Sequence, residues 1–115
     1  MDSLQQLSRQ RDRVIQEIAA LGPMRMGTVT ERMLPTRRSD GSVTRRGPYS
    51  MYTFKDAGKT RGKHLRTAEE AALYRRQIEA FRRYQELSAE LVRVSQRLAD
   101  LEADADRASK KNSRR

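Results

Sequence analysis

The chain has 115 residues, of which 36% are hydrophobic and 35% are charged, and its formal net charge is +10. A chain of this size and composition has too few apolar residues for a large core, so it favours long amphipathic helices over a compact sandwich or barrel. It contains no cysteine and one histidine, which excludes disulfides and cysteine-ligated zinc and leaves no imidazole cluster for a metal.

The first predicted element is a helix that begins at Leu4. Its apolar residues recur at the three- and four-residue spacing of one narrow helical stripe, and Gly22-Pro23 end it. The stripe consists of Leu4, Leu7, Val14, Ile18 and Leu21. Because so narrow a stripe is typical of a coiled-coil seam, we expect this helix to pack against another helix.

Residues 24–66 lack helical periodicity and are predicted to form a short antiparallel β-meander. β-forming residues are separated there by Pro, Gly and Asp turn signals. The predicted strands are 26–34, 48–55 and 63–66, with a loop at 39–41 and a turn at 56–58.

A second helix is predicted to start at Thr67, where Thr67-Ala68-Glu69-Glu70 has a capping-box pattern. No Pro or Gly follows, and we expect this helix to run to about Ala105. Its apolar stripe changes register, which indicates that the first half packs on the sheet or the first helix and the second half on a different partner. The early stripe is Ala71, Tyr74, Ile78 and Phe81, and the late stripe is Tyr84, Leu87, Leu91, Val94, Leu98, Leu101 and Ala105.

The predicted fold class is therefore mostly α. We expect an elongated single domain over residues 1–106, in which an N-terminal helix and a long coiled-coil-like C-terminal helix flank a small, basic antiparallel sheet. Residues 107–115 form a basic tail in which Ala108 is the one apolar residue, so we expect this tail to be disordered.

The late stripe of the second helix needs a partner. If the first helix folds back antiparallel, Leu21 lies near the start of the second helix and Leu4 near its middle. The distal stripe would then be exposed, and we expect it to form a homodimer interface. That interface would consist of Leu91, Val94, Leu98 and Leu101. The alternative is that the sheet shifts the first helix along, so that it covers this stripe within the monomer.

Positive charge is concentrated in the β-meander. Residues 25–66 include eleven Lys or Arg and three acidic residues, a formal charge of +8, whereas residues 1–21 carry three of each. Such a localised patch predicts binding to the phosphate backbone of nucleic acid, with double-stranded DNA as the expected partner. The alternative is a solvated sheet surface whose charged edges prevent aggregation. The candidate binding residues, two of them in the second helix, are Arg25, Arg32, Arg37, Arg38, Arg45, Arg46, Lys55, Lys59, Arg61, Lys63, Arg66, Arg75 and Arg82.

Two arginine pairs, Arg37-Arg38 and Arg45-Arg46, flank the loop between the first two strands. Such a loop can reach into a groove and contact phosphates or guanine edges, and the alternative is a mobile loop. In the following strand we expect Tyr49, Tyr52 and Phe54 to pack in the core. An exposed tyrosine beside arginines would instead stack on an unpaired base.

Two further pairs, Arg75-Arg76 and Arg82-Arg83, lie seven residues apart and so share one face of the second helix. That face would extend the basic surface. Glu79 and Glu86 follow these arginines at four-residue spacing, so ordinary ion pairs on the helix surface are the alternative.

No residues in the sequence are arranged for catalysis. His64 is the only imidazole and has no accompanying triad or ligand motif, and there is no Walker loop, dinucleotide-binding fingerprint or H-E-x-x-H motif. We therefore expect no enzyme activity, no cofactor and no bound metal.

Three short motifs occur in the order Gly27-Thr28-Val29-Thr30-Glu31-Arg32, Gly47-Pro48-Tyr49 and Phe81-Arg82-Arg83-Tyr84-Gln85-Glu86-Leu87. In their order and spacing, residues 24–91 resemble an uncharacterised family of small prokaryotic proteins that are often encoded within or beside transposable elements. Many members have a cysteine-containing loop between the first two motifs, whereas residues 35–46 here contain no cysteine. The resemblance implies a mobile-element context with DNA or a transposase as partner, and the missing cysteines argue against a metal-dependent function.

The sequence as a whole predicts a non-enzymatic nucleic-acid-binding accessory protein, with DNA favoured and an RNA-binding variant left open. The rival hypothesis is a coiled-coil adaptor that grips another protein, for example a transposase, through residues 87–105. No run of 18 apolar residues occurs, and residues 1–13 are too polar for a signal peptide. We therefore expect a soluble, cytoplasmic protein that does not enter a membrane.

Overall fold

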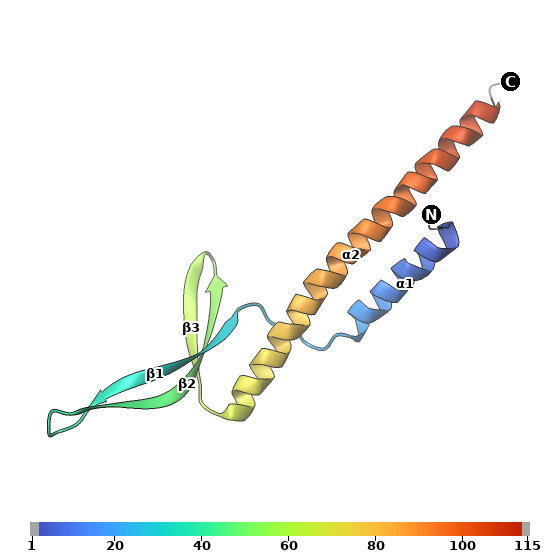
Figure 1. Ribbon diagram of the computed structural model, residues 1–115. Helices are drawn as coiled ribbons and strands as arrows, with labels where there is room; N and C mark the ends of the chain where they lie inside the picture. The colour runs from blue at the N-terminus through green and yellow to red at the C-terminus, as the bar shows by residue number, and fades with distance from the viewer. Residues whose placement is uncertain (1–2, 114–115) are drawn as a thin grey trace. The chain divides into compact units, whose positions relative to one another are not determined.

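The computed structural model describes residues 3–113, except for the side chains of Arg46, Asn112 and Ser113. Its elements are α1 (Leu4–Ala20), β1 (Thr28–Arg37), β2 (Val43–Asp56), β3 (Lys59–Leu65) and α2 (Ala68–Ser113), as Figure 1 shows. The predicted fold class, mostly helical with a β-meander insert, is confirmed. The chain divides into two compact units, a helical unit made of residues up to Leu21 and from Arg83 onward, and a sheet unit made of residues 22–82.

A capping box starts α1. The Ser3 hydroxyl accepts a hydrogen bond from the Gln6 amide at 3.2 Å, and the Gln6 side chain accepts one from the Ser3 amide at 2.8 Å. At the other end, the Leu21 amide donates to the Ile18 carbonyl at 3.1 Å. Because Gly22 and Pro23 follow directly, the helix stops where the sequence predicted.

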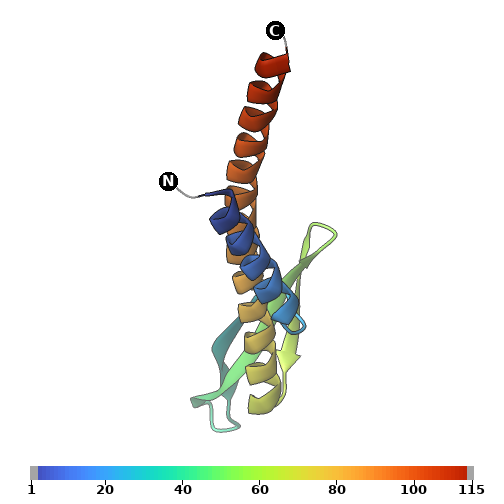
Figure 2. The ribbon, with the colours of Figure 1, turned by 90° about the vertical axis from the view of Figure 1, so that its right-hand side faces the viewer.

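The helical unit is built on a seam between α1 and the later part of α2, which lie side by side and antiparallel (Figures 1 and 2). This helix seam contains Leu7 and Val14 from α1 and Leu87 and Val94 from α2, all at most 6% exposed. Burying each such side chain stabilises the fold by roughly 1.5–3 kcal/mol. The seam is therefore the main source of stability in this unit.

The helix seam corrects the expected position of the first helix. Leu4 lies beside Leu98, around the same surface hollow, beyond the middle of α2. α1 therefore covers the predicted dimerisation stripe, in which Val94 is buried and Leu91, Leu98 and Leu101 are half-buried. The expectation of an exposed stripe is wrong, and the alternative in which α1 covers it within the monomer holds.

Within the sheet unit, the segment that precedes β1 contacts α2, because the Arg25 amide donates to the Gln77 carbonyl at 3.0 Å. Within the helical unit, α1 packs on the part of α2 that contains Leu87 and Val94. That packing covers part of the stripe at residues 87–105 that the adaptor hypothesis would use.

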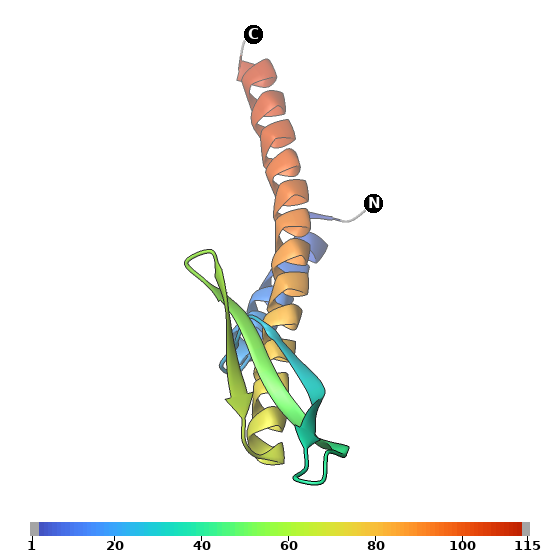
Figure 3. The ribbon, with the colours of Figure 1, turned by 90° about the vertical axis from the view of Figure 1, so that its left-hand side faces the viewer.

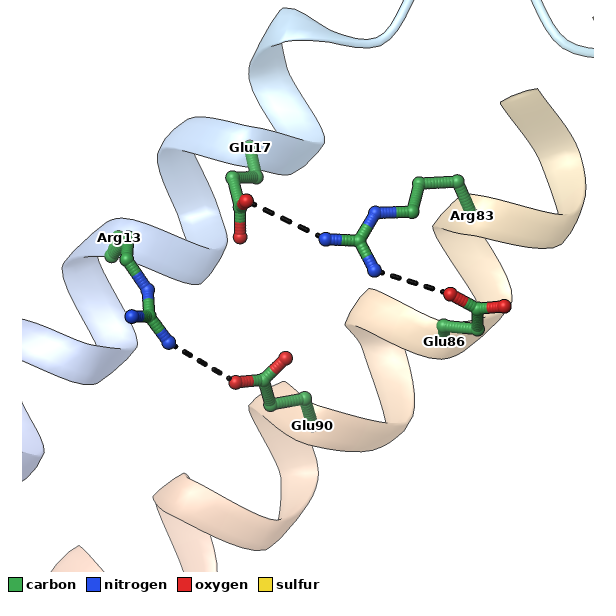
Figure 4. A network of polar contacts seen from close by, with 5 residues as sticks. All are labelled: Arg13, Glu17, Arg83, Glu86 and Glu90. Carbon is green, nitrogen blue, oxygen red and sulfur yellow. Dashed lines mark hydrogen bonds and ion pairs between the residues drawn. The ribbon is translucent and has the colours of Figure 1, made fainter. Parts of the chain in front are cut away.

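Ion pairs line one side of the helix seam (Figure 4). Arg13 of α1 lies 3.4 Å from Glu90, and Arg83 of α2 contacts both Glu17 at 3.5 Å and Glu86 at 3.1 Å. Exposed pairs of this kind contribute only about 0.2–1 kcal/mol each. They help to fix the register of the two helices, while burial of the seam supplies most of the stability.

The three strands form an antiparallel sheet in the order β1-β2-β3. β3 pairs with residues 50–56 of β2, whereas β1 and β2 continue past it as a two-stranded ribbon (Figure 3). We call residues 34–46, the ribbon and its turn, the hairpin arm. An irregularity in register between Arg32 and Leu34 separates the arm from the three-stranded part. β2 begins at Val43 rather than at residue 48, and β1 continues to Arg37, so both strands reach further toward the turn than predicted. The loop predicted at 39–41 lies in the turn between them.

One face of the sheet packs on the first turns of α2. The buried core there consists of Tyr52, Leu65, Ala71, Tyr74 and Ile78, with Val29 and Phe54 packed against it. The Tyr52 ring meets the Tyr74 ring edge-on, with centroids 5.0 Å apart, and the Tyr52 hydroxyl donates to the Met26 carbonyl. The prediction that Tyr52 and Phe54 belong to the core is confirmed.

α2 starts at the predicted cap but ends later than predicted. The Thr67 hydroxyl accepts from the Glu70 amide at 3.0 Å, and the helix continues to Ser113 rather than to about residue 105. Basic residues in the last turn of α2 complement the helix dipole. Ion pairs at three- and four-residue spacing also stabilise this end of the helix. These pairs are Arg107–Asp104 at 3.9 Å and Lys110–Asp106 at 3.3 Å. The predicted disordered tail is therefore wrong for residues 107–113, and residues 114–115 lie outside the described part of the chain.

Candidate nucleic-acid interface

Some of the predicted binding residues are engaged by carboxylates of the sheet unit. The pairs are Arg61–Asp56 at 3.1 Å, Arg75–Glu31 at 3.2 Å and Arg82–Glu79 at 3.6 Å. All of these side chains are exposed, so the pairs add little to stability. Each pair nevertheless lowers the net positive charge that a phosphate would meet at that place. The helix-surface ion pair that was the alternative therefore applies to Arg82, whose partner Glu79 is on the same helix, whereas Arg75 pairs with Glu31 of β1.

Arg25 has a structural role. Its Nε donates to the Gln77 side-chain oxygen at 3.0 Å, and its guanidinium lies over the ring of Tyr74, 4.1 Å from the centroid. The side chain is half-buried and joins the segment before β1 to α2. We therefore no longer assign Arg25 to the interface.

Lys63 also faces α2. Its Nζ donates to the Tyr74 hydroxyl at 2.9 Å and lies 3.6 Å from a Glu70 carboxylate oxygen. The hydrogen bond to Tyr74 is the largest cause that raises the pKa of Lys63 above its ordinary value, and the nearby Glu70 charge adds to it. Lys63 thus helps to hold the sheet on α2, and we remove it from the interface as well.

The other candidates are exposed cations in the hairpin arm, the β2–β3 turn, the outer face of the sheet and the link before α2. Among the described side chains, no ion pair involves any of them. They are Arg32, Arg37, Arg38, Arg45, Lys55, Lys59 and Arg66. The side chain of Arg46 lies outside the described residues.

The turn of the hairpin arm is closed by hydrogen bonds. The Arg38 amide donates to the Ser42 carbonyl at 2.8 Å, and the Gly41 amide donates to the Arg38 carbonyl at 3.0 Å. Inside the turn, the Asp40 carboxylate accepts from the Ser42 hydroxyl at 2.6 Å and from its amide at 2.9 Å. These two bonds, the hydroxyl first, hold the pKa of Asp40 below its ordinary value. Four hydrogen bonds thus close the turn at residues 38–42.

Strand register places two of the arm's arginines on one face. Arg37 pairs with Val43 and Arg45 pairs with Pro35. Because the faces alternate along a strand, these two cross-strand pairs, two positions apart, share a face and set the guanidinium groups diagonally on it. Arg38 follows at the start of the turn. The arm therefore carries several unpaired cations on a narrow two-stranded ribbon.

A hollow of about 340 Å³ lies on the sheet face opposite α2, which we call the outer face. Its walls, which are mostly apolar, are Arg32, Leu34, Tyr49, Met51 and His64. The Tyr49 and His64 rings meet edge to face with centroids 5.3 Å apart. Tyr49 is thus half-buried on the outer face rather than in the core where we expected it. The sequence signal was available, because strand alternation separates Tyr49 and Met51 from Tyr52.

A neighbouring hollow of about 390 Å³ shares Tyr49 and His64 with the first and reaches Arg66 and the first turn of α2. Its one carboxylate is that of Glu31, which the Arg75 guanidinium already contacts. An anion that enters this hollow therefore meets Arg66 as an unpaired cation.

Within residues 3–113 there is no group of three or more His, Asp or Glu side chains that could hold a metal ion. In the same stretch, neither helix has a long enough apolar segment to cross a membrane. His64 contacts the Tyr49 ring, which makes it part of the outer-face hollow.

The glycines of the first two motifs have clear structural roles. Gly27 has a φ of 126°, and a Cβ built there would lie 2.5 Å from a Tyr52 ring carbon. Gly47 has a φ of 138° and a Cβ there would lie 2.9 Å from the Arg32 carbonyl, where the register changes. Comparisons with known families, with curated proteins and with solved structures found no match. The resemblance to the mobile-element family therefore stays a prediction that rests on its three motifs.

Proposed function

We propose that this protein is a non-enzymatic nucleic-acid-binding protein of the cytoplasm, and that it grips the backbone of double-stranded DNA with the hairpin arm and the β2–β3 turn. The observation that carries the proposal is that some exposed cations of the sheet unit form ion pairs with carboxylates whereas others do not. Arg61, Arg75 and Arg82 each contact a carboxylate, whereas the described cations of the arm do not. Unpaired, exposed arginines are free to replace the counterions of a phosphate backbone.

The shape of the arm supports the same ligand. A two-stranded β-ribbon fits the major groove of B-DNA, and residues 34–37 and 43–46 form such a ribbon. Arg37 and Arg45 lie on one face of it, and Arg38 lies at the hydrogen-bonded turn. Arginine forks onto phosphates and onto guanine edges, so these side chains supply affinity and can supply base preference.

The test is a salt titration of binding to a labelled duplex, with structured RNA as a second ligand. One variant replaces the arm residues Arg37, Arg38, Arg45 and Arg46 with Ala. A matched control removes the same charge from α2 by replacing Arg76, Arg93, Arg97 and Arg107 with Ala. Each lost phosphate contact should lower the slope of log K against log salt by about 0.9. We expect a weaker affinity and a flatter slope in the arm variant, and smaller changes in the control.

Equal losses in the two variants would show that bulk charge attracts DNA and that the arm is no binding surface. Tighter binding of wild-type protein to structured RNA than to the duplex would contradict the assignment to DNA. The adaptor and homodimer hypotheses both use the stripe at residues 87–105. Because Val94 is buried there and Leu91, Leu98 and Leu101 are half-buried within the helical unit, we propose neither.

A further inference from the structure

The outer face departs from the pattern of a solvated sheet. An antiparallel sheet that packs one face on a helix should be polar on the other, and most outer positions here are polar or small. They include Thr28, Thr30, Thr53, Thr60 and Gly62. Leu34, Tyr49 and Met51 break this pattern and gather around one hollow, where Leu34 remains 49% exposed. The fold alone gives no reason for this apolar cluster.

The hollow has the size and the walls of a site for a flat apolar ring. Its volume of about 340 Å³ lies at the small end of the range of roughly 300–1,000 Å³ for ligand pockets. Two aromatic rings, Tyr49 and His64, and the thioether of Met51 line it. Aromatic and thioether groups pack well against a flat π system.

Two arginines line the hollows that these rings share. Arg32 pairs with Tyr49 across the strands and lines the hollow, and Arg66 lines the neighbouring hollow that shares Tyr49 and His64. Neither arginine takes part in an ion pair with a described residue. A ligand that fills the hollow and satisfies these arginines is flat, apolar on its faces and flanked by negative charge. A nucleotide within a chain has this chemistry.

We propose that the outer-face hollow binds an unpaired base, in a single-stranded segment that adjoins the duplex held by the hairpin arm. This inference rests on the proposed function. It adds an unpaired base to the ligand, which a blunt duplex does not have. The base stacks on Tyr49, while Arg32 and Arg66 contact the phosphates before and after it. Stacking is tolerant of sequence, so the site recognises the unpaired state rather than a particular base.

The test compares a blunt duplex with a duplex of the same length that carries a short single-stranded overhang. We expect wild-type protein to prefer the overhang, and Tyr49→Leu to lose that preference while its affinity for the blunt duplex is unchanged. Loss of one stacked base corresponds to roughly a 5- to 150-fold weaker affinity. Tyr84→Leu, the same change at an exposed tyrosine of α2, is the control and should keep the preference.

A second measurement uses wild-type protein, in case Tyr49→Leu does not fold. A 2-aminopurine base in the overhang should lose fluorescence on binding, because stacking on an aromatic ring quenches it. Equal affinity for the two duplexes, or fluorescence that does not change on binding, would overturn this inference and leave the proposed function intact. If wild-type protein bound neither duplex at low salt, the proposed function itself would fail.

Discussion

The guanidinium carbon of Arg25 lies 4.1 Å from the centroid of the Tyr74 ring, so one of the basic residues of the insert is part of its packing. The same side chain donates to Gln77, and Tyr74 in turn accepts from Lys63. Arg25 from the segment before β1, Lys63 from β3 and Gln77 from α2 thus meet around Tyr74. Net charge alone does not separate such structural cations from binding ones.

Arg25→Ala should lower the free energy of unfolding by about 1–2 kcal/mol, because it removes a cation–π contact and a side-chain hydrogen bond. At temperatures where the variant is folded, its affinity for duplex DNA and the salt slope should match those of the wild type. Thermal unfolding followed by circular dichroism, together with the salt titration, measures both quantities. A flatter salt slope with unchanged stability would return Arg25 to the interface.

Gly27→Ala should destabilise the sheet unit by more than 1 kcal/mol, on the order of the cost of a strained backbone. The backbone there has a φ of 126°, and the new Cβ would meet both the Tyr52 ring and the Thr53 carbonyl at 2.5–2.6 Å. Gly22→Ala is the matched control, since a Cβ at Gly22 meets no atom within 4 Å. Its change should be below about 0.5 kcal/mol. Equal midpoints for the two variants in urea would contradict the close approach at Gly27.

Local patterns in the sequence predicted the parts of the fold that depend on local chemistry. The apolar spacing from Leu4, the break at Gly22-Pro23 and the hydroxyl cap at Thr67 each determine structure within a few residues, and all three predictions hold. The length of β2 was underestimated, because Gly47-Pro48 resembles a strand boundary while the pairing simply shifts register there. A strand can continue through an irregularity in register at a position where residue propensities alone predict that the strand ends.

Features that depend on tertiary contacts were not available from the sequence. Whether α1 covers Val94 depends on a contact between two helices that are far apart in the sequence, and no local pattern determines that contact. Likewise, Arg75 and Arg37 look alike in the sequence, yet the first lies 3.2 Å from Glu31 and the second belongs to the unpaired set of the arm. The candidate interface is defined by which cations lack a carboxylate partner. Those partners are known only from the folded structure.

Asp40 gives the turn of the hairpin arm a specific response to pH. The Ser42 hydroxyl and amide lower the pKa of Asp40 below 3.8, so the carboxylate stabilises the turn above that pH. The contribution is lost as the pH falls through the lowered pKa, because protonation weakens both bonds. Ser42→Ala removes the hydroxyl bond, and we expect the pKa of Asp40 to rise toward 3.8 in an NMR titration of its carboxyl carbon. No rise would mean that the Ser42 hydroxyl does not contact Asp40 in solution.

The placement of α1 predicts the outcome of charging the distal stripe of α2. Leu98 is half-buried beside Leu4, whereas Val92 on the same helix is 59% exposed. Leu98→Asp should lower the free energy of unfolding by roughly 1–3 kcal/mol, because it removes apolar burial and partly desolvates a carboxylate. Val92→Asp introduces the same charge at a solvated position and should change stability by less than about 0.5 kcal/mol. Since the seam is formed within one chain, the unfolding midpoint of the wild type should not depend on protein concentration. A midpoint that rises with concentration, together with a fall in mass by light scattering for a folded Leu98→Asp variant, would restore the dimer interface.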